Sequence, residues 1–232
     1  MIIFTKLLLA HLLGDFVFQP TRWLIHKEAN RARSGFLYAH IAIHYALMML
    51  LLWDLSFWKM ALIIAVSHYL IDLAKLYTNS LFRNKLFPFL IDQLLHLAVL
   101  FICAFYGNLW ETSASLWEQI DWPLVTAIVF VTFPSAIIMN KLLENMSEQI
   151  ELDHKSLPNA GKYIGIIERL FVLIFIILGR WEAIGLLITA KSVFRFNDLK
   201  ESNSRKLTEY ILIGTLLSFG LAVLAGLLYV SI

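Results

Sequence analysis

The sequence predicts an all-α polytopic membrane protein of about eight transmembrane helices. Three observations predict this fold class. Apolar residues make up 59% of the chain and charged residues only 16%. Several apolar windows approach the roughly 20 residues that a helix needs to cross a bilayer. Lys and Arg gather in every second connection between these windows, as expected when successive helices cross in opposite directions.

The expected spans follow the apolar windows in chain order. The clearest windows contain no charged residue at all: 36–53, 122–140 and 211–232. We expect the first window to be a retained transmembrane helix, because Asp15 interrupts it and no basic leader precedes it. The single cysteine, Cys103, excludes an intrachain disulfide and a cysteine metal cluster. The eight spans are expected near residues 2–18, 36–53, 58–77, 86–106, 122–142, 161–179, 182–198 and 209–231.

Two polar segments divide this order. Residues 19–35 are too short and too charged to cross, so we expect them to lie along the membrane interface. The longest polar stretch, residues 146–160, separates the front of the chain from its last helices. We therefore expect a four-helix membrane bundle over residues 1–110, formed by two repeated hairpins, and a back bundle of C-terminal membrane helices over residues 111–232.

The distribution of basic residues predicts the direction of each span. The connections after the first, third, fifth and seventh spans are basic, whereas the alternate connections hold only Lys59 and Arg180. Basic connections stay in the cytoplasm. We therefore expect a multi-pass protein of the inner (plasma) membrane with both termini outside. The basic residues of the four connections are Arg22, Lys27, Arg31, Arg33, Arg83, Lys85, Lys141, Lys155, Lys162, Lys200, Arg205 and Lys206.

Four pairs of ionisable residues interrupt the first four spans. In each pair the two residues are four apart, which stacks them on one helix face about 6 Å apart along the axis. The orientation brings all four pairs to the cytoplasmic third of the membrane. It also predicts a deeper layer of His11, His44, His68 and His96. The shallower layer is expected to hold Asp15, His40, Asp72 and Asp92.

The chemistry of these eight residues favours a metal site. Each ionisable group in a bilayer costs roughly 3 kcal/mol or more unless it is paired, hydrated or bound to an ion. Imidazole and carboxylate together suit a divalent transition metal: zinc first, with manganese or iron as alternatives. Eight potential ligands allow one or two ions, and Asp15, Asp72 and Asp92 are candidate bases. A metal-free polar network, including a proton path, is the alternative.

The back of the chain carries its own charges within apolar windows: Glu168, Arg169, Lys191, Arg195 and Glu209. Lys191 and Arg195 share a helix face and could bind the phosphate or carboxylate of a substrate. Ion pairing between helices is the alternative. Pro134 should kink the fifth span and free a backbone carbonyl.

The motifs carry a family likeness. The front stretches "LLLAHLLGDFVFQ", "SHYLIDLAK" and "DQLLHL" resemble the bacterial membrane family catalogued as domain of unknown function 3307. The back stretches "ERLFVLIFIILGRWEAIGLLITAKSVFRF" and "EYILIGTLLSFG" resemble a C-terminal region found in many of its members. The His and Asp spacing is more distantly similar to inner-membrane proteins provisionally described as metal-dependent hydrolases. The first resemblance implies the fold, and the second a reaction class.

We therefore expect a membrane-embedded metal-dependent hydrolase that acts near the cytoplasmic face on a lipid or a lipid-linked ester or phosphoester. The expected partner is membrane lipid; nucleic acid is not expected, and the oligomeric state is open. One alternative is a metal-ion or proton transporter or channel that uses the same cluster, and another is a non-catalytic scaffold. The outer halves of the first spans, such as residues 7–10 and 47–52, are apolar. These segments offer no polar path toward the outer face of the membrane, so we favour the enzyme over the transporter.

Overall fold

A computed structural model of the chain describes residues 1–82, 85–107, 116–147, 160–202 and 205–232. These residues are helical apart from short turns, so the all-α fold expected from the sequence is confirmed. The chain divides into two compact units, Met1–Thr126 and Ala127–Ile232. The predicted boundary at residues 110 and 111 lies outside the described residues and stays a prediction.

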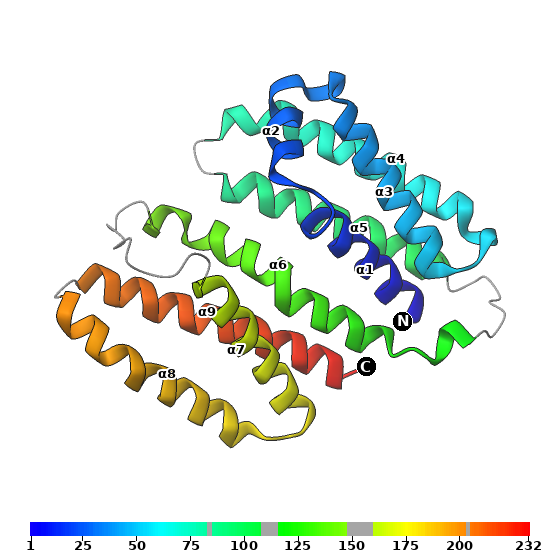
Figure 1. Cartoon of the computed structure of the whole chain (residues 1–232). Coiled ribbons are helices and arrows are strands. Elements are labelled where there is room, and N and C mark those ends of the chain that lie inside the picture. Colours follow the sequence, from blue (N-terminus) through cyan, green and yellow to red (C-terminus); the bar gives the residue numbers. More distant parts are fainter. Residues whose placement is uncertain (83–84, 108–115, 148–159, 203–204) are drawn as a thin grey trace. The chain divides into compact units, whose positions relative to one another are not determined.

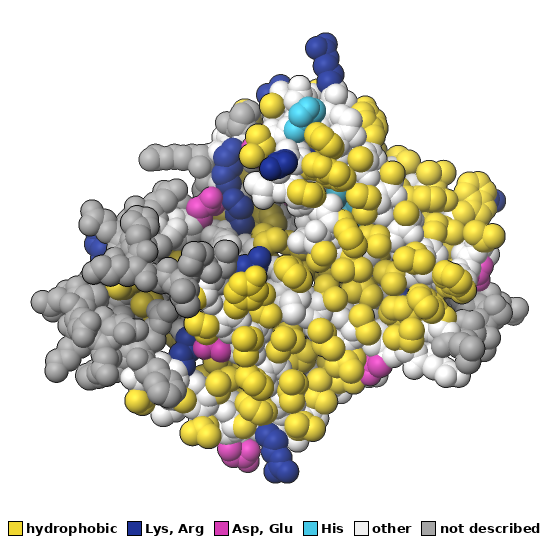
Figure 2. All heavy atoms as spheres, in the orientation of Figure 1, with side chains coloured by type: hydrophobic (Ala, Val, Ile, Leu, Met, Phe, Trp, Pro, Cys, Tyr) yellow, Lys and Arg dark blue, Asp and Glu magenta, His cyan; other side chains and the backbone are white. Residues whose placement is uncertain are grey.

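Membrane spans are supported by length and composition. Five stretches of the described residues are long and apolar enough to cross a bilayer: Gly35–Leu52, Leu55–Thr78, Leu86–Tyr106, Trp122–Glu144 and Lys206–Val230. A bent pair, Ile2–Phe16 with Thr21–Arg33, raises the number to six if it is one span. Hydrophobic side chains cover most of the described surface in Figure 2. The chain is therefore a membrane protein, and the count of eight spans stays a prediction.

The first unit is a closed four-helix bundle. Helix α1 (Ile2–Phe16) packs against α3 (Gly35–Leu52) and α5 (Leu86–Gly107), and α4 (Trp58–Thr78) packs between α3 and α5. Each of the four helices therefore has two neighbours in the bundle (Figure 1). This is the arrangement expected for two hairpins that close on each other. It gives the four helices one shared interior, as the polar pairs require.

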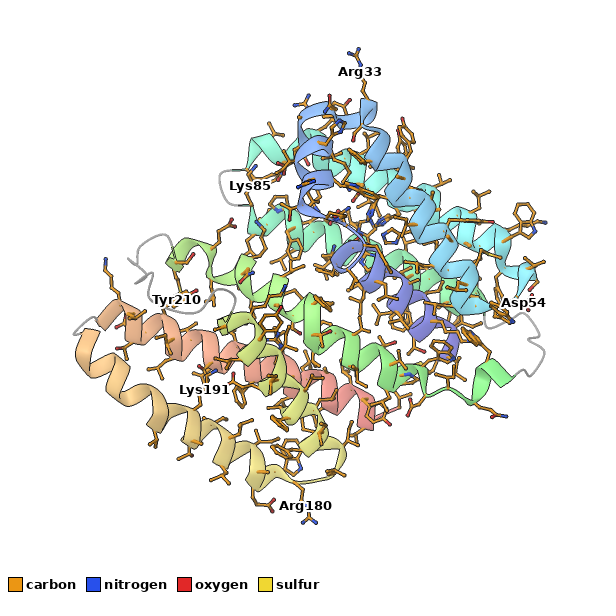
Figure 3. The ribbon with its side chains drawn as sticks, in the orientation of Figure 1. Arg33, Asp54, Lys85, Arg180, Lys191 and Tyr210 are labelled. Atoms are coloured by element: carbon orange, nitrogen blue, oxygen red, sulfur yellow. The ribbon has the colours of Figure 1, made fainter. Side chains whose placement is uncertain are left out.

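The connections of the first unit follow from local chemistry. Helix α3 ends at Trp53 in the left-handed region (φ 53°). Asp54 then accepts a hydrogen bond from the backbone N–H of Ser56 at 2.8 Å, which starts the short turn into α4. Figure 3 shows Arg33 and Lys85 at one end of this bundle and Asp54 at the other. The two basic connections therefore share an end of the bundle, as the alternation of charge requires.

Between α1 and α3 the chain forms a short amphipathic helix, α2 (Thr21–Asn30), bent by 80° from α1. It packs on α3, where the ring of Trp23 stacks on the ring of Phe36 at 5.1 Å. Ile25 is exposed, whereas Lys27 on the other face is buried. Helix α2 therefore covers one end of the bundle and inserts a charged side chain into it.

The second unit is built on the packing of α7 (Ala160–Ile177) against α9 (Arg205–Val230). Gly226 allows the close contact, because a Cβ there would lie 2.8 Å from Cδ1 of Ile176. Helix α8 (Trp181–Ser202) packs on the same two helices after a turn at Gly179 (φ 67°). The latter part of α6 (Trp122–Ser147) adds Ala127 and Val131 to the apolar core.

Candidate metal centre

The four deep histidines meet in the interior of the first unit. The ring centroids of His44 and His68 are 4.0 Å apart, and so are those of His68 and His96. His11 lies 5.1 Å from His96 by the same measure. All four side chains are buried. The predicted convergence of the four histidines is therefore confirmed.

Asp15 is the centre of the shallower layer. Its Oδ1 atom lies 3.1 Å from Nε2 of His44, 3.2 Å from Nε2 of His40 and 3.5 Å from Nε2 of His68. The Nε2 atoms of His40 and His68 are themselves 3.2 Å apart. One carboxylate oxygen and three imidazole nitrogens from three different helices therefore converge on one small volume.

These separations match those of a metal's ligand shell. Ligand atoms about 2.0–2.1 Å from a tetrahedral zinc ion lie about 3.3–3.4 Å from one another. Four of the six separations among the ligand atoms of Asp15, His40, His44 and His68 run from 3.1 to 3.5 Å: Oδ1 of Asp15 to each of the three Nε2 atoms, and Nε2 of His40 to Nε2 of His68. Hydrogen bonds alone satisfy the group poorly, because one ring nitrogen carries either one proton or one lone pair. Nε2 of His40 also lies 3.1 Å from Nε2 of Gln19. This nitrogen therefore has more polar neighbours than it can hydrogen-bond.

Gly14 explains how two helices approach so closely here. A Cβ atom at this position would overlap the imidazole ring of His44. Glycine therefore lets His44 of α3 reach Asp15 across the backbone of α1. In the stretch "HLLGD", the histidine and the aspartate supply polar atoms, and the glycine supplies the space that the His44 ring fills.

Asp72 closes one side of the cluster. Its Oδ2 atom accepts a hydrogen bond from Nζ of Lys27 at 2.8 Å and lies 3.7 Å from Nε2 of His40. The Lys27 and Asp72 side chains are 5% and 8% exposed, so this is a buried ion pair. A buried charge of this kind persists only with a partner. The ammonium group from α2 thus neutralises and orients Asp72 beside the cluster.

Asp92 closes the opposite side. Its Oδ2 atom accepts hydrogen bonds from Nζ of Lys75 at 2.6 Å and from Nε2 of Gln93 at 3.2 Å. The same Gln93 amide donates to Oδ2 of Asp15 at 3.0 Å, and its Oε1 lies 3.3 Å from Nε2 of His11. Gln93 therefore links the two carboxylates to one another and to the deep layer.

The charge balance of the cluster leaves one carboxylate uncompensated. Lys27 pairs with Asp72, and Lys75 pairs with Asp92. No lysine or arginine of the described residues pairs with Asp15, whose neighbours in range are histidines. A divalent cation bound by Asp15 and neutral imidazoles would supply the missing positive charge. A protonated histidine is the other way to supply it.

A small cavity lies on the deep side of the histidines. Its volume is about 10 Å³, of the order of one water molecule. His11, His44, His68 and His96 line it together with Ser67, and apolar side chains close the rest. The cluster therefore has room for a small reactant next to its ligand atoms. The apolar lining residues are Leu7, Met48, Ile64, Val99 and Leu100.

The cluster lies in the part of the chain that matches a known family. Residues 3–125 match the family described as "Protein of unknown function (DUF3307)". This chain belongs to the DUF3307 family. The match ends within one residue of the end of the first unit, so every residue of the cluster lies in the DUF3307 region. No curated protein and no solved structure matches the chain.

All eight predicted ligands lie in this DUF3307 cluster. Three groups of side chains have ligand atoms close enough to share a metal ion: His11, Asp15, His44 and His68; His40, His68 and Asp72; and Asp15, Asp92 and His96. Sequence reasoning missed the polar residues that orient them, namely Gln19, Lys27, Lys75 and Gln93. Two signals were available: Gln93 adjoins Asp92, and Lys75 lies one helical turn after Asp72.

The predicted substrate residues lie in the second unit. Nζ of Lys191 donates to Oε2 of Glu168 at 2.6 Å, so this lysine is ion-paired between α8 and α7 (Figure 3). This contact is the ion pairing between helices that is the alternative to substrate binding. The side chain of Arg195 lies outside the described residues. Substrate binding by Lys191 and Arg195 stays a prediction.

Arg169 takes different partners from its neighbour Glu168. Its guanidinium donates to the backbone carbonyls of Val131 at 2.5 Å and Thr132 at 3.1 Å. Both carbonyls lie in the turn of α6 before Pro134. Proline also removes the helical donor to the Phe130 carbonyl, and the Ser135 hydroxyl donates to that oxygen at 2.7 Å instead. The carbonyl that we predicted Pro134 would free is therefore that of Phe130, and it accepts a hydrogen bond from the Ser135 hydroxyl instead.

Proposed function

We propose that the first unit is a membrane-embedded, metal-dependent hydrolase. Asp15, His40, His44 and His68 hold the metal, zinc being the first choice for three imidazoles and a carboxylate. The observation that carries the proposal is that Oδ1 of Asp15 lies 3.1–3.5 Å from the Nε2 atoms of all three histidines, two of which are 3.2 Å from one another. Manganese and iron bind the same types of ligand, so the test below includes both.

The reaction is hydrolysis of an ester or phosphoester. The oxygen of water forms a bond to the phosphorus or acyl carbon, and the ester oxygen leaves with the bonding electron pair and takes up a proton. A bound divalent metal lowers the pKa of water and polarises the attacked group. The proton released by water passes to a carboxylate of the shallower layer, for which Asp15, Asp72 and Asp92 are the candidates.

Two features favour hydrolysis over transport. The deep side of the histidine layer is closed by buried apolar side chains, among them Leu7, Met48 and Leu100. A transporter needs polar groups that continue toward the other face. The cavity beside the ligands has the volume of about one water molecule. That size suits a reactant held at the ligands better than a conducting path.

The substrate class follows from position. We propose that the cluster lies near the cytoplasmic face of the inner membrane, with both termini outside, because the basic residues Arg33 and Lys85 share one end of the bundle (Figure 3). A lipid or lipid-linked headgroup arrives at that depth by lateral diffusion. Membrane lipid is therefore the proposed partner.

The test begins with metal content. Purified protein exchanged into metal-free detergent buffer is titrated with Zn²⁺, Mn²⁺ or Fe²⁺, and bound metal is measured by elemental analysis. His44→Ala and His68→Ala should each weaken the affinity for the ion at this site at least tenfold. His26→Ala is the matched control, because His26 is exposed and bonds to Ser34 away from the cluster. Wild-type protein that takes up no ion would overturn the proposal.

Activity is then measured with defined probes. Bis(p-nitrophenyl) phosphate, p-nitrophenyl acetate and vesicles of fluorescent phosphatidylglycerol cover phosphoester, carboxylic ester and lipid substrates. Metal-dependent hydrolysis of any of them that falls more than 100-fold in His68→Ala supports the enzyme. The same proteoliposomes are assayed for Zn²⁺, Mn²⁺ and proton flux. Robust flux abolished by His68→Ala, without hydrolysis, would replace the enzyme by a transporter.

A further inference from the structure

Within the part of the chain that the structure describes, four buried polar atoms of the cluster make no hydrogen bond: Nδ1 of His40, Oδ1 of Asp92 and both ring nitrogens of His96. Three of the four belong to Asp92 and His96. Both residues are 3% exposed. Leaving a buried polar group unsatisfied costs about 1–3 kcal/mol. Such a group next to a metal-ligand cluster indicates a missing ligand.

We infer that Asp92 and His96 hold a second divalent cation, and that Asp15 bridges it to the first. Asp15, Asp92 and His96 each offer a ligand atom within 4.8 Å of the other two. They come from α1 and α5, whereas the three histidines of the first site come from α3 and α4. The inference rests on the proposed function for the first ion, and its own residues are Asp92 and His96.

The two oxygens of Asp15 face two halves of the cluster. Oδ1 faces the three imidazoles of the first site at 3.1–3.5 Å. Oδ2 faces the other way, with Nε2 of Gln93 at 3.0 Å and Nε2 of His11 at 3.8 Å. A carboxylate with its oxygens divided in this manner can bind one cation through each.

The neighbours of Asp92 orient it as a ligand. Lys75 and Gln93 both donate to Oδ2, at 2.6 and 3.2 Å. Oδ1 is left with its lone pairs free and with Nδ1 of His96 at 3.8 Å. Carboxylates that bind metals are commonly held in this way by hydrogen bonds to outer groups. The lysine therefore holds Asp92 in one orientation.

A bound water is the competing explanation, because the adjoining cavity of about 10 Å³ is lined by His96. A water would satisfy one nitrogen of His96 and would bind no metal.

A second cation has a further consequence for the substrate. Paired metals about 3.5–4 Å apart stabilise both the attacking and the leaving oxygen of a phosphoester. We therefore infer a phosphoester as the substrate class.

The experiment counts ions in the full chain in detergent. Wild-type protein should bind two Mn²⁺ or Zn²⁺ per chain in titration followed by elemental analysis. Asp92→Asn and His96→Gln should each bind one, and His26→Ala should bind two. Electron paramagnetic resonance of the Mn²⁺ form gives a second readout, because two neighbouring Mn²⁺ ions couple their spins. The coupled signal should be present in wild type and give way to an isolated-ion signal in His96→Gln.

The outcomes separate the two proposals. One ion per chain in wild type, with an isolated Mn²⁺ signal, overturns the second site and leaves the first. No bound ion overturns both. The wild-type titration and resonance spectrum decide the question even if a variant does not fold. Hydrolysis of p-nitrophenyl acetate without any hydrolysis of bis(p-nitrophenyl) phosphate by the two-ion form would contradict the phosphoester assignment.

Discussion

Both units bury charged residues among apolar helices, but they satisfy them differently. Among the described residues of the second unit, each buried charge has a partner: Glu168 has Lys191, and Arg169 has two carbonyls and the Ser218 hydroxyl. In the first unit the polar atoms exceed their partners. Asp92 and His96 keep unbonded atoms, and Asp15 has no cationic residue beside it among the described residues.

The difference separates a structural role from a binding role. The Glu168–Lys191 pair is matched in charge, and the Arg169 guanidinium is matched in hydrogen bonds to two carbonyls and a hydroxyl. A cluster with converging lone pairs and spare negative charge can be completed by a metal cation or by protonation of a histidine. Two regions with similar numbers of charged residues can therefore differ in function, and the count of unmatched atoms tells them apart.

Removing metal should give the largest difference between the two units. A ligand present at 1,000 times its Kd stabilises the folded state by about 4 kcal/mol. Chelator should therefore raise amide hydrogen exchange strongly in α1, α3, α4 and α5, while α7 and α9 should exchange as before. Hydrogen exchange with mass spectrometry measures the amide protection of both units in one sample.

Re-addition of Zn²⁺ or Mn²⁺ serves as the control for this comparison and should restore protection in the first unit. Mg²⁺ should not, because it prefers oxygen ligands to imidazole. Equal effects of chelator on both units, or none on either, would remove the distinction.

Breaking the ion pair of the second unit should have a smaller effect, confined to stability. Glu168→Gln leaves Lys191 without its carboxylate. Removing one partner of a fully buried pair costs about 3–5 kcal/mol. The Lys191 and Glu168 side chains are 21% and 10% exposed, so we expect about 1–3 kcal/mol. Thermal unfolding in detergent should show the loss, with metal content unchanged.

The double variant Glu168→Gln, Lys191→Met tests the mechanism. It removes both charges and should recover part of the lost stability, as coupled partners do. A fall in metal content or in hydrolysis in Glu168→Gln would instead show that this pair serves the cluster, and the separation of roles would be wrong.

Local sequence patterns predicted most of the fold and most of the candidate ligands. Apolar windows located the long helices, and i, i+4 spacing with alternating direction placed four histidines at one level. This worked because the interior of a bundle is the one place where a helix in lipid can put ionisable side chains. The bundle of α1, α3, α4 and α5 follows from that requirement.

Contacts between distant segments could not be predicted in the same way. Lys27 looked like one more basic residue of a connection, yet its ammonium enters the bundle and pairs with Asp72, 45 positions away. Gln93 carries no charge, and its place beside Asp92 in the sequence does not show that it also reaches Asp15 of α1. Such roles depend on how α2 and α5 dock, and no periodic pattern encodes that docking.

The last and smallest expected effect concerns Gly14, where packing and ligand placement meet. Replacing glycine by alanine inside a helix normally stabilises it by roughly 0.5–1 kcal/mol. At Gly14 the added methyl group would overlap the ring of His44, so His44 must move away from Asp15. We expect Gly14→Ala to weaken metal binding about tenfold, or about 1.4 kcal/mol, as measured by titration.

Gly35→Ala is the matched control, because a Cβ there meets nothing within 4 Å. Both substitutions raise helix propensity in the same unit, so a change in metal affinity found only at position 14 isolates the contact with His44. Unchanged affinity in Gly14→Ala would mean that the ring can leave its place without loss. His44 would then not be a ligand, and the first site would reduce to Asp15, His40 and His68, the three that the remaining distances of 3.2 and 3.5 Å still bring together.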